Sequence, residues 1–278
     1  MLRRIASALV LGVLVLLVIW FRGPLLDAVL ALVLLLACFE FSKLNPGTDF
    51  RQLLSFLVPI CLLFLGATLV SLLHPGTAIR LLPYMLAGLA AIVLPLTLVG
   101  GKDAWTLWTL VVSGTIYIAS GTSAILLLLL QTRGPASGGH YGQLLFIVIL
   151  AGVIACDTAA YFVGSWIGKH RFFPAISPAK SVEGAVAGFC FAVVLGLVLG
   201  VWLLHMFWPL AAILGGLVGA GAQAGDLAES SMKRIAGVKD SGSLIPGHGG
   251  ILDRIDSLMV VAPLSACYLG LLGMIHQL

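Results

Sequence analysis

The feature that most constrains the fold of this chain is a series of almost uncharged apolar runs, each about 20 residues long. As an α-helix, a run of that length crosses the ~30 Å hydrocarbon core of a bilayer. The runs lie at approximately residues 5–21, 24–41, 53–73, 81–99, 105–130, 142–166, 183–204, 208–231 and 257–277. We therefore predict an all-α, polytopic membrane protein with about nine transmembrane helices and a cytoplasmic N-terminus. The long run at 105–130 is expected to tilt, or to break near Ser120 and Gly121.

The composition excludes an ordinary soluble domain. Only 9 % of the residues are charged and the mean hydropathy is +1.14, whereas soluble domains are about 25 % charged. The strand-length alternation of a membrane β-barrel is absent. The five cysteines lie inside apolar runs without a CxxC spacing, which is typical of small core side chains and not of a metal or redox pair.

The basic residues predict the orientation, because Lys and Arg accumulate in cytoplasmic connections. With the N-terminus in the cytoplasm, three of the 15 Lys and Arg residues (Arg22, Arg80 and Arg133) lie outside and all the others inside. This sorting also places the longest connections on the cytoplasmic side. No soluble domain interrupts the helices, so we expect an N-terminal transmembrane region at 1–140 and a C-terminal catalytic region at 141–278. The second region contains two long cytoplasmic loops, 167–182 and 232–256.

A polar stretch near the end of the chain stands out against this apolar background. The chain has 15 Lys and Arg and 11 Asp and Glu residues, and a large share of them lies in this stretch. Its charged members are Asp226, Glu229, Lys233, Arg234, Lys239, Asp240, Asp253, Arg254 and Asp256. Charge gathered in one place in such a chain indicates a charged ligand.

The spacing of these residues places their side chains on common helix faces. The end of the helix predicted at 208–231 carries four polar residues at i, i+3, i+4 and i+7, namely Asp226, Glu229, Ser230 and Lys233. Asp253 and Asp256 share a face where the next helix begins, so two abutting helices would bring the carboxylates together. Hard oxygen donors without a nearby His or Cys favour Mg²⁺ over zinc or copper. The alternative is a solvated helix end with a ladder of opposite charges.

Asp157 lies inside the run at 142–166, about eleven residues or ~16 Å from its cytoplasmic end. An ionisable side chain at that depth is a functional hypothesis by default. Tyr161, Gly164 and Gly168 continue the same helix face, and the two glycines allow another helix to approach closely. We therefore expect Asp157 to point into a protein site; the alternative is a structural hydrogen bond.

Both long loops carry residues suited to phosphate. Glycines between 237 and 250, with Lys239, let backbone N–H groups approach phosphate oxygens; the alternative is a flexible basic loop. In the other loop, Ser177 begins a turn before a proline and Ser181 is expected to cap the following helix. Lys180 lies on the same membrane face and can contact a phosphate or an anionic head group.

The stretch from Ser230 to Asp256 resembles the signature of the phosphatidate cytidylyltransferase (CDP-diacylglycerol synthase) family. The matching residues are Ser230, Met232, Lys233, Arg234, Lys239, Asp240, Gly242, Ile245, Pro246, His248, Gly249, Gly250, Ile251, Asp253, Arg254, Ile255 and Asp256. Two upstream blocks, 157–168 and 177–184, are also similar to that family. The resemblance covers roughly residues 150–260, and the first five runs resemble it only in being apolar and similarly spaced.

The resemblance implies the reaction of CTP with phosphatidic acid to give CDP-diacylglycerol and pyrophosphate, with one or more Mg²⁺ ions. It also implies the cell inner membrane as the location, with the active site facing the cytoplasm. Asp226 and Asp253 would then be the metal ligands. The expected catalytic residues are Lys233, Arg234, Lys239, Asp240, His248, Arg254 and Asp256, with the bases holding phosphate groups. The expected substrate-binding residues are Asp157, Tyr161, Ser177, Lys180, Glu183, Ser230, Gly249 and Gly250. The implied partners are CTP, phosphatidic acid, the lipid bilayer and a second copy of the chain in a homodimer, and no nucleic acid.

The chemistry of this reaction fits the residue types present. The second pKa of a phosphate monoester is about 6, so the lipid phosphate is a nucleophile at pH 7 without a general base. Two polyanions must meet, so catalysis calls for charge neutralisation and in-line positioning. Two alternatives remain: a CTP-dependent kinase of a lipid alcohol such as a polyprenol, which would need a base, and a transporter with Asp157 and Asp226 on its path.

Overall fold

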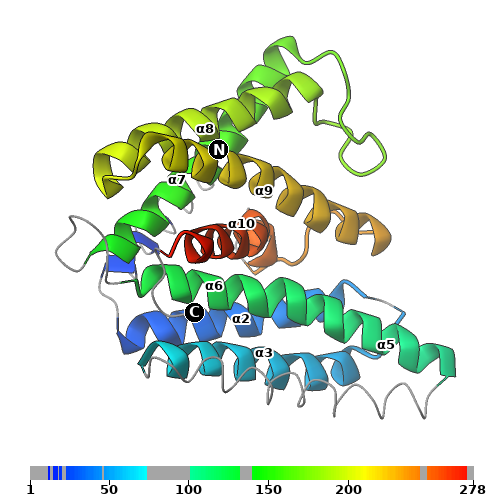
Figure 1. The fold of residues 1–278 in the computed structure, drawn as a ribbon. Helices are drawn as coiled ribbons and strands as arrows, with labels where there is room; N and C mark the ends of the chain where they lie inside the picture. The colour runs from blue at the N-terminus through cyan, green and yellow to red at the C-terminus, as the bar shows by residue number, and fades with distance from the viewer. Residues whose placement is uncertain are drawn as a thin grey trace. The chain divides into compact units, whose positions relative to one another are not determined.

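The computed structural model describes residues 23–45, 47–73, 101–131, 140–244 and 249–273, together with residues 12, 15–17, 19 and 20. These residues form helices joined by loops, with an isolated antiparallel bridge between Arg171 and Ser181 (Figure 1). The helices are α2 (Pro24–Lys43), α3 (Phe50–Leu73), α5 (Gly101–Gly114), η1 (Thr115–Ala119), α6 (Ser120–Leu129), α7 (Tyr141–Ile167), α8 (Val182–Leu204), α9 (Trp208–Ile235) and α10 (Leu252–Leu271).

The predicted all-α membrane fold is confirmed. Within the described residues, seven helical spans are long and apolar enough to cross a membrane. They correspond to seven of the nine predicted runs. The predicted run at 81–99 and most of that at 5–21 lie outside the described residues, so the total of about nine stays a prediction.

The run predicted at 105–130 is one continuous span whose backbone changes register in the middle. Residues Thr115–Ala119 form a π-helix between α5 and α6. Such π turns occur as local bulges inside α-helices. The helix therefore does not break at Ser120 and Gly121; its irregularity is the π turn directly before Ser120.

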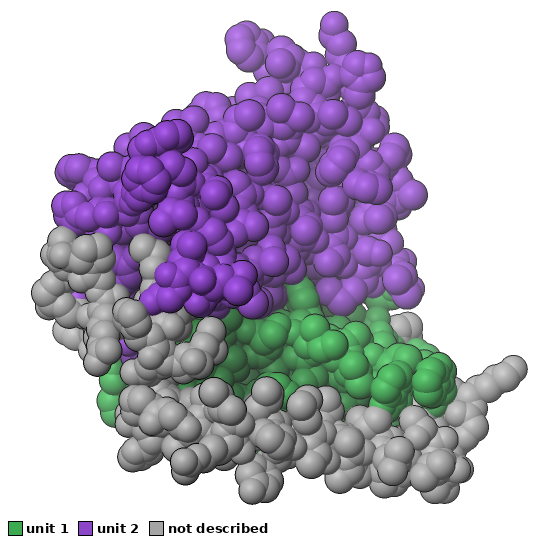
Figure 2. Space-filling model, viewed as in Figure 1, with its two compact units in different colours: residues 1–127, 236–254, 277–278 green, residues 128–235, 255–276 purple. Residues whose placement is uncertain are grey.

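The described chain divides into two compact units, shown in different colours in Figure 2. Unit 1 comprises residues 1–127, 236–254 and 277–278, and unit 2 comprises residues 128–235 and 255–276. The long polar stretch thus contributes to both units: its part from 236 to 254 belongs to unit 1, and the rest belongs to unit 2.

Unit 1 is built on packing among α2, α3, α5 and η1. Leu53, Ile60, Leu107 and Val111 form a buried cluster between α3 and α5. Gly114, at the end of α5, lies so close to α2 that a Cβ atom there would be 2.7 Å from a ring carbon of Phe41. These contacts fix the end of α2 that carries the polar residues discussed below.

Unit 2 is built on α7, α8 and α9, which pack against one another. Glycines replace larger side chains where the backbones meet, as is common between membrane helices. A Cβ atom on Gly184 of α8 would lie 2.5 Å from the carbonyl oxygen of Ala160 and 3.0 Å from the Cα atom of Gly164, both in α7. The close approach expected from Gly164 is therefore confirmed, and it places α8 against the α7 face that carries Asp157.

Helix α10 meets α9 at the level of the aspartates. A Cβ atom on Gly225 would lie 2.6 Å from the backbone carbonyl oxygen of Asp256. The Ser257 hydroxyl donates a hydrogen bond to the carbonyl oxygen of Ala222 at 3.2 Å. The residue after Gly225 is Asp226, so the crossing brings Asp226 and Asp256 to the same place in unit 2.

Candidate active site

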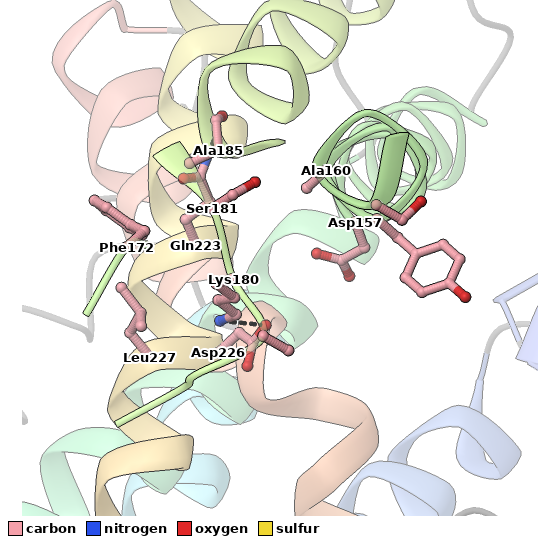
Figure 3. Close-up of a pocket in the computed structure, with 13 residues that line it drawn as sticks. Asp157, Ala160, Phe172, Lys180, Ser181, Ala185, Gln223, Asp226 and Leu227 are labelled. Carbon is pink, nitrogen blue, oxygen red and sulfur yellow. Dashed lines mark hydrogen bonds and ion pairs between the residues drawn. The ribbon is translucent and has the colours of Figure 1, made fainter. Parts of the chain in front are cut away.

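Unit 2 contains a pocket of about 370 Å³ between α7, α8, α9 and the loop that joins α7 to α8 (Figure 3). Polar groups occupy one part of its wall, and apolar and aromatic side chains the rest. The lining residues are Asp157, Ala160, Tyr161, Gly164, Ser165, Phe172, Ala179, Lys180, Ser181, Ala185, Gln223, Asp226 and Leu227. A mostly apolar pocket with a few convergent polar groups is the usual form of a small-molecule site.

Lys180 and Asp226 form an ion pair in this pocket, with 2.6 Å between the Lys180 Nζ and Asp226 Oδ2 atoms (Figure 3). Their side chains are 28 % and 33 % exposed, so the pair is accessible from the pocket. The Ser230 hydroxyl, one turn further along α9, donates to the other Asp226 oxygen at 3.2 Å. The structure thus brings together three residues that the sequence predicted for the site.

The loop before α8 holds Lys180 in place through its backbone. The Phe172 N–H donates to the Lys180 carbonyl oxygen at 2.9 Å, and the Lys180 N–H donates to the Ser177 carbonyl oxygen at 3.2 Å. Directly after Lys180, the Ser181 hydroxyl accepts a hydrogen bond from the Gly184 N–H at 3.2 Å and caps α8. The predicted cap is confirmed. It satisfies a backbone donor that the first turn of a helix leaves without a partner.

Three carboxylates, those of Asp157, Asp226 and Asp256, lie within electrostatic range of Lys180. Asp157 interacts electrostatically with Asp226, Asp256 and Lys180. Asp256 interacts in turn with Asp226, Lys180 and Lys233. Figure 3 shows the Asp157 carboxylate extending from α7 on the side that faces the Lys180–Asp226 pair. Of the carboxylates predicted to converge from α9 and α10, Asp226 and Asp256 therefore lie near each other in unit 2, together with Asp157 from α7, whereas Asp253 belongs to unit 1.

The donor chemistry of this group fits Mg²⁺. Carboxylate oxygens are the hard ligands that this ion takes, and it is usually held by one or two of them together with water and substrate phosphates. Within the described residues, no three His, Cys, Asp or Glu side chains are grouped closely enough to hold an ion by themselves. An arrangement of one or two protein carboxylates completed by substrate is therefore the one that these residues can form.

Asp253, the second predicted metal ligand, belongs to unit 1. Its Oδ2 atom accepts hydrogen bonds from the N–H groups of Ser241 (2.9 Å) and Gly250 (2.8 Å) and lies 3.0 Å from the Ser241 hydroxyl. Gly249 has φ +82°, and a Cβ atom on it would lie 2.5 Å from Asp253 Oδ2. The glycines therefore fold the loop around Asp253, while their binding of substrate stays a prediction.

Glu40 is a polar residue of unit 1 that sequence reasoning missed. It lies near the end of α2, is only 4 % exposed and bonds to the same loop as Asp253. The sequence does single it out, because Asp27 and Glu40 are the only two charged residues in the run at 24–41. Gln223, which lines the unit 2 pocket and donates to the Ala185 carbonyl oxygen at 2.9 Å, was also missed.

The remaining predicted residues are distributed as follows. Unit 2 also holds Tyr161, Ser177, Glu183, Lys233 and Arg234, and unit 1 holds Lys239, Asp240, Gly249, Gly250 and Arg254. Tyr161 lines the pocket and is 71 % exposed. His248 lies outside the described residues.

Several of these residues have structural partners. Lys233 forms an ion pair with Glu229, which is buried. The Arg234 Nε atom donates to the Ile176 carbonyl oxygen at 3.2 Å and so contacts the loop before α8. Glu183 accepts a hydrogen bond from His170 at 2.7 Å and does not line the pocket. The roles of these residues in catalysis or binding stay predictions.

The fold and the pocket define a polytopic α-helical membrane protein with an acidic, lysine-bearing site among its helices. Sequence comparison gives the family: the chain belongs to the cytidylyltransferase family, whose model matches residues 2–272.

Individual relatives carry a more specific name. The chain is 50 % identical over 125 residues to a phosphatidate cytidylyltransferase of Synechocystis, covering 44 % of this chain and 42 % of that protein. It is 42 % identical over 144 residues to the phosphatidate cytidylyltransferase of Staphylococcus saprophyticus, covering 49 % of this chain and 50 % of the relative. It is 41 % identical over 142 residues to that of Staphylococcus aureus, covering 48 % and 50 %. The chain thus spans about half the length of the curated relatives it matches.

Proposed function

We propose that this protein transfers the cytidylyl group of CTP to phosphatidic acid, giving CDP-diacylglycerol and pyrophosphate. The observation that carries the proposal is the pocket lined by Asp157 and by the Lys180–Asp226 ion pair, with Asp256 close enough to interact with that pair electrostatically. Membership of the cytidylyltransferase family and relatives named phosphatidate cytidylyltransferase support the same reaction.

The step is an in-line displacement at phosphorus. A non-bridging oxygen of the lipid phosphate attacks the α-phosphorus of CTP and forms a new P–O bond. The bond from that phosphorus to the α,β-bridging oxygen breaks, and pyrophosphate leaves with the electron pair. Because the lipid phosphate is largely deprotonated at pH 7, no side chain has to act as a general base.

The chain's own contribution is to hold and neutralise phosphate groups. Lys180 is the cation on the pocket wall and can bind a phosphate oxygen. Tyr161 and Phe172 supply aromatic surface for the apolar or base portion of a substrate. Lys233, Arg234, Lys239, Arg254 and His248 are proposed to hold further phosphate groups.

Mg²⁺ bound to these carboxylates would supply positive charge to the triphosphate and the leaving pyrophosphate. Asp226 is proposed as a ligand in unit 2 and Asp253 as a ligand in unit 1. Asp157 and Asp256 contribute negative charge beside Asp226. We further propose the inner membrane as the location, with the site facing the cytoplasm, and a homodimer as the assembly.

The decisive experiment uses CTP labelled at two positions. Purified protein in detergent is incubated with Mg²⁺, phosphatidic acid and CTP carrying ³²P at either the α or the γ position, followed by lipid extraction. The proposal predicts that α-label enters the lipid and γ-label is released as pyrophosphate. Entry of γ-label into a lipid alcohol instead would show a kinase, and the absence of label in any lipid would contradict both.

A further inference from the structure

Glu40 is a buried acid in an otherwise apolar part of α2, near its C-terminal end. Its side chain is only 4 % exposed, although it ends in a carboxylate. Burying an ionised group is strongly unfavourable unless hydrogen bonds replace its water. The partners of this carboxylate therefore indicate what it stabilises.

Those partners are at the start of α10 and in the loop before it. The Glu40 Oε1 atom accepts a hydrogen bond from the Ile251 N–H at 2.9 Å, and the Oε2 atom accepts one from the Leu252 N–H at 2.8 Å. Helix α10 begins at Leu252, and N–H groups at the start of a helix have no acceptor within it. Glu40 thus supplies the acceptors for the helix start from 212 residues away in sequence.

Glu40 and Asp253 are linked through one serine. The Ser241 Oγ atom lies 3.0 Å from Glu40 Oε2 and 3.0 Å from Asp253 Oδ2. A hydroxyl carries a single proton, so Ser241 donates to one carboxylate at a time and keeps both near the same oxygen. Asp253 also accepts from the N–H groups of Ser241 and Gly250. Movement of Glu40 therefore changes the surroundings of Asp253 directly.

The loop leaves room for Glu40 only because two of its residues are glycines. The three atoms nearest to a Cβ atom on Gly242 would all belong to Glu40, with Oε1 at 2.6 Å and Cδ at 3.0 Å. A Cβ atom on Gly250 would collide with both Glu40 oxygens and with the Ser241 hydroxyl oxygen. The glycines of this loop thus accommodate the Glu40 carboxylate, in addition to any role toward phosphate.

We propose that Glu40 is a positioning residue, which orients Asp253 by holding Ser241 and the first residues of α10. This inference rests on the proposed function, because the role of Asp253 as a Mg²⁺ ligand belongs to that proposal. Groups that orient a metal ligand through hydrogen bonds typically change metal affinity or activity by ~10–100-fold when they are replaced. Glu40 does not touch substrate in this account; it acts through Asp253.

The first test is Glu40→Gln. The amide has one oxygen, so in either orientation its NH₂ group faces the N–H of Ile251 or of Leu252. We expect kcat to fall ~10–100-fold and the KM for phosphatidate to change by less than about threefold, as for loss of an interaction made in the transition state. Mn²⁺ binding to the same purified protein, followed by electron paramagnetic resonance, should weaken by ~10–100-fold.

The second test is a double-mutant cycle with Gly242→Ala. The atoms nearest to the new methyl group would be those of Glu40, so this substitution should lower kcat and Mn²⁺ affinity in the same direction as Glu40→Gln. In a Glu40→Ala background, Gly242→Ala should cost little more, because the side chain it displaces is gone. Additive losses would show that Gly242 acts independently of Glu40 and would contradict the inference.

Matched controls separate positioning from general damage. Gly66→Ala places a methyl group in α3 with nothing within 4 Å. Asp49→Asn removes an exposed acid of unit 1 whose carboxylate accepts from the Arg51 N–H. Both should keep wild-type activity and Mn²⁺ affinity. If Glu40→Gln yields too little folded protein, Ser241→Ala gives a milder test of the same link and should shift both readouts in the same direction.

A folded Glu40→Gln protein with wild-type kcat and Mn²⁺ affinity would overturn the inference and leave Glu40 as a purely structural residue. That result differs from failure of the proposed function, in which the wild-type chain itself transfers no cytidylyl group. If the wild-type chain transfers no cytidylyl group, the Mn²⁺ affinity alone tests the role of Glu40. Equal affinities for wild type and Glu40→Gln would then refute the inference, and weaker binding by the variant would support it.

Discussion

Replacing Lys180 with methionine removes one positive charge from the unit 2 pocket and keeps a side chain of similar length. Lys180 pairs with Asp226 at 2.6 Å and also interacts with Asp157 and Asp256. Its loss removes this cation from the vicinity of all three carboxylates. We expect the main effect on catalysis and a smaller one on stability.

The size of the effect on stability follows from the exposure of the ion pair, and the size of the effect on kcat follows from the charge of Lys180. The side chains of the pair are 28 % and 33 % exposed, so the pair should contribute only ~1 kcal/mol or less to the free energy of unfolding. In the transition state, a positioned cation can interact with phosphate charge by up to ~4 kcal/mol at ~4 Å and an effective dielectric constant of ~20. Loss of one such group typically lowers kcat by ~10²–10³-fold, and we expect Lys180→Met to fall in that range.

The assay is the initial rate of α-label transfer from CTP into lipid, with CTP and phosphatidate varied separately. Lys180→Arg keeps the charge and should retain more activity than Lys180→Met. Lys43→Met is the matched control, because Lys43 is an exposed lysine that lies outside the pocket. Its Nζ atom lies over the Phe39 ring, 4.3 Å from the ring centroid. A folded Lys180→Met protein with wild-type kcat would refute this account of the pocket.

Three further results are expected. Asp226→Asn should abolish label transfer while the protein stays folded by circular dichroism, and full activity would remove Asp226 from the Mg²⁺ site. In thermal unfolding, Gly184→Ala should lower the free energy of unfolding by ~1–3 kcal/mol through overpacking, since its Cβ atom would lie 2.5 Å from the Ala160 carbonyl oxygen. Gly216→Ala should be nearly neutral in the same measurement, because the atom nearest to its Cβ atom would be 3.7 Å away. The kcat/KM for phosphatidate should rise with pH through ~6, where the lipid phosphate loses its second proton, and then level off; a rise centred well above that pH would indicate a general base.

The helices could be predicted from the sequence because hydropathy is a local property. Helix α8 was expected at 183–204 and lies at Val182–Leu204, and Ser181 caps it as expected. The proximity of Asp226 and Asp256 was also predictable. Both lie near the ends of successive helices that meet on the same side of the membrane, and each shares a helix face with other polar residues. Such features depend on residues a few positions apart.

Features that depend on distant partners could not be predicted in the same way. Glu40 bonds to residues 201, 211 and 212 positions further along the chain. Its hydropathy context, at the end of a membrane span beside Lys43, is equally typical of an interfacial charge. Only the packing of unit 1 shows that it is buried. The same holds for Gln223, whose place on the pocket wall follows from the contact of α8 with α9.

The residues predicted for the site therefore need to be interpreted in two ways. In unit 2, Asp226 and Lys180 lie on the wall of the pocket, where a substitution acts on the ligand directly. In unit 1, Gly242 and Gly250 face the Glu40 carboxylate, so a substitution there acts first on the geometry of the loop. Loss of activity at one of these glycines is by itself no sign that its backbone binds phosphate. Only a variant whose effect persists after Glu40 has been replaced points to contact with the substrate.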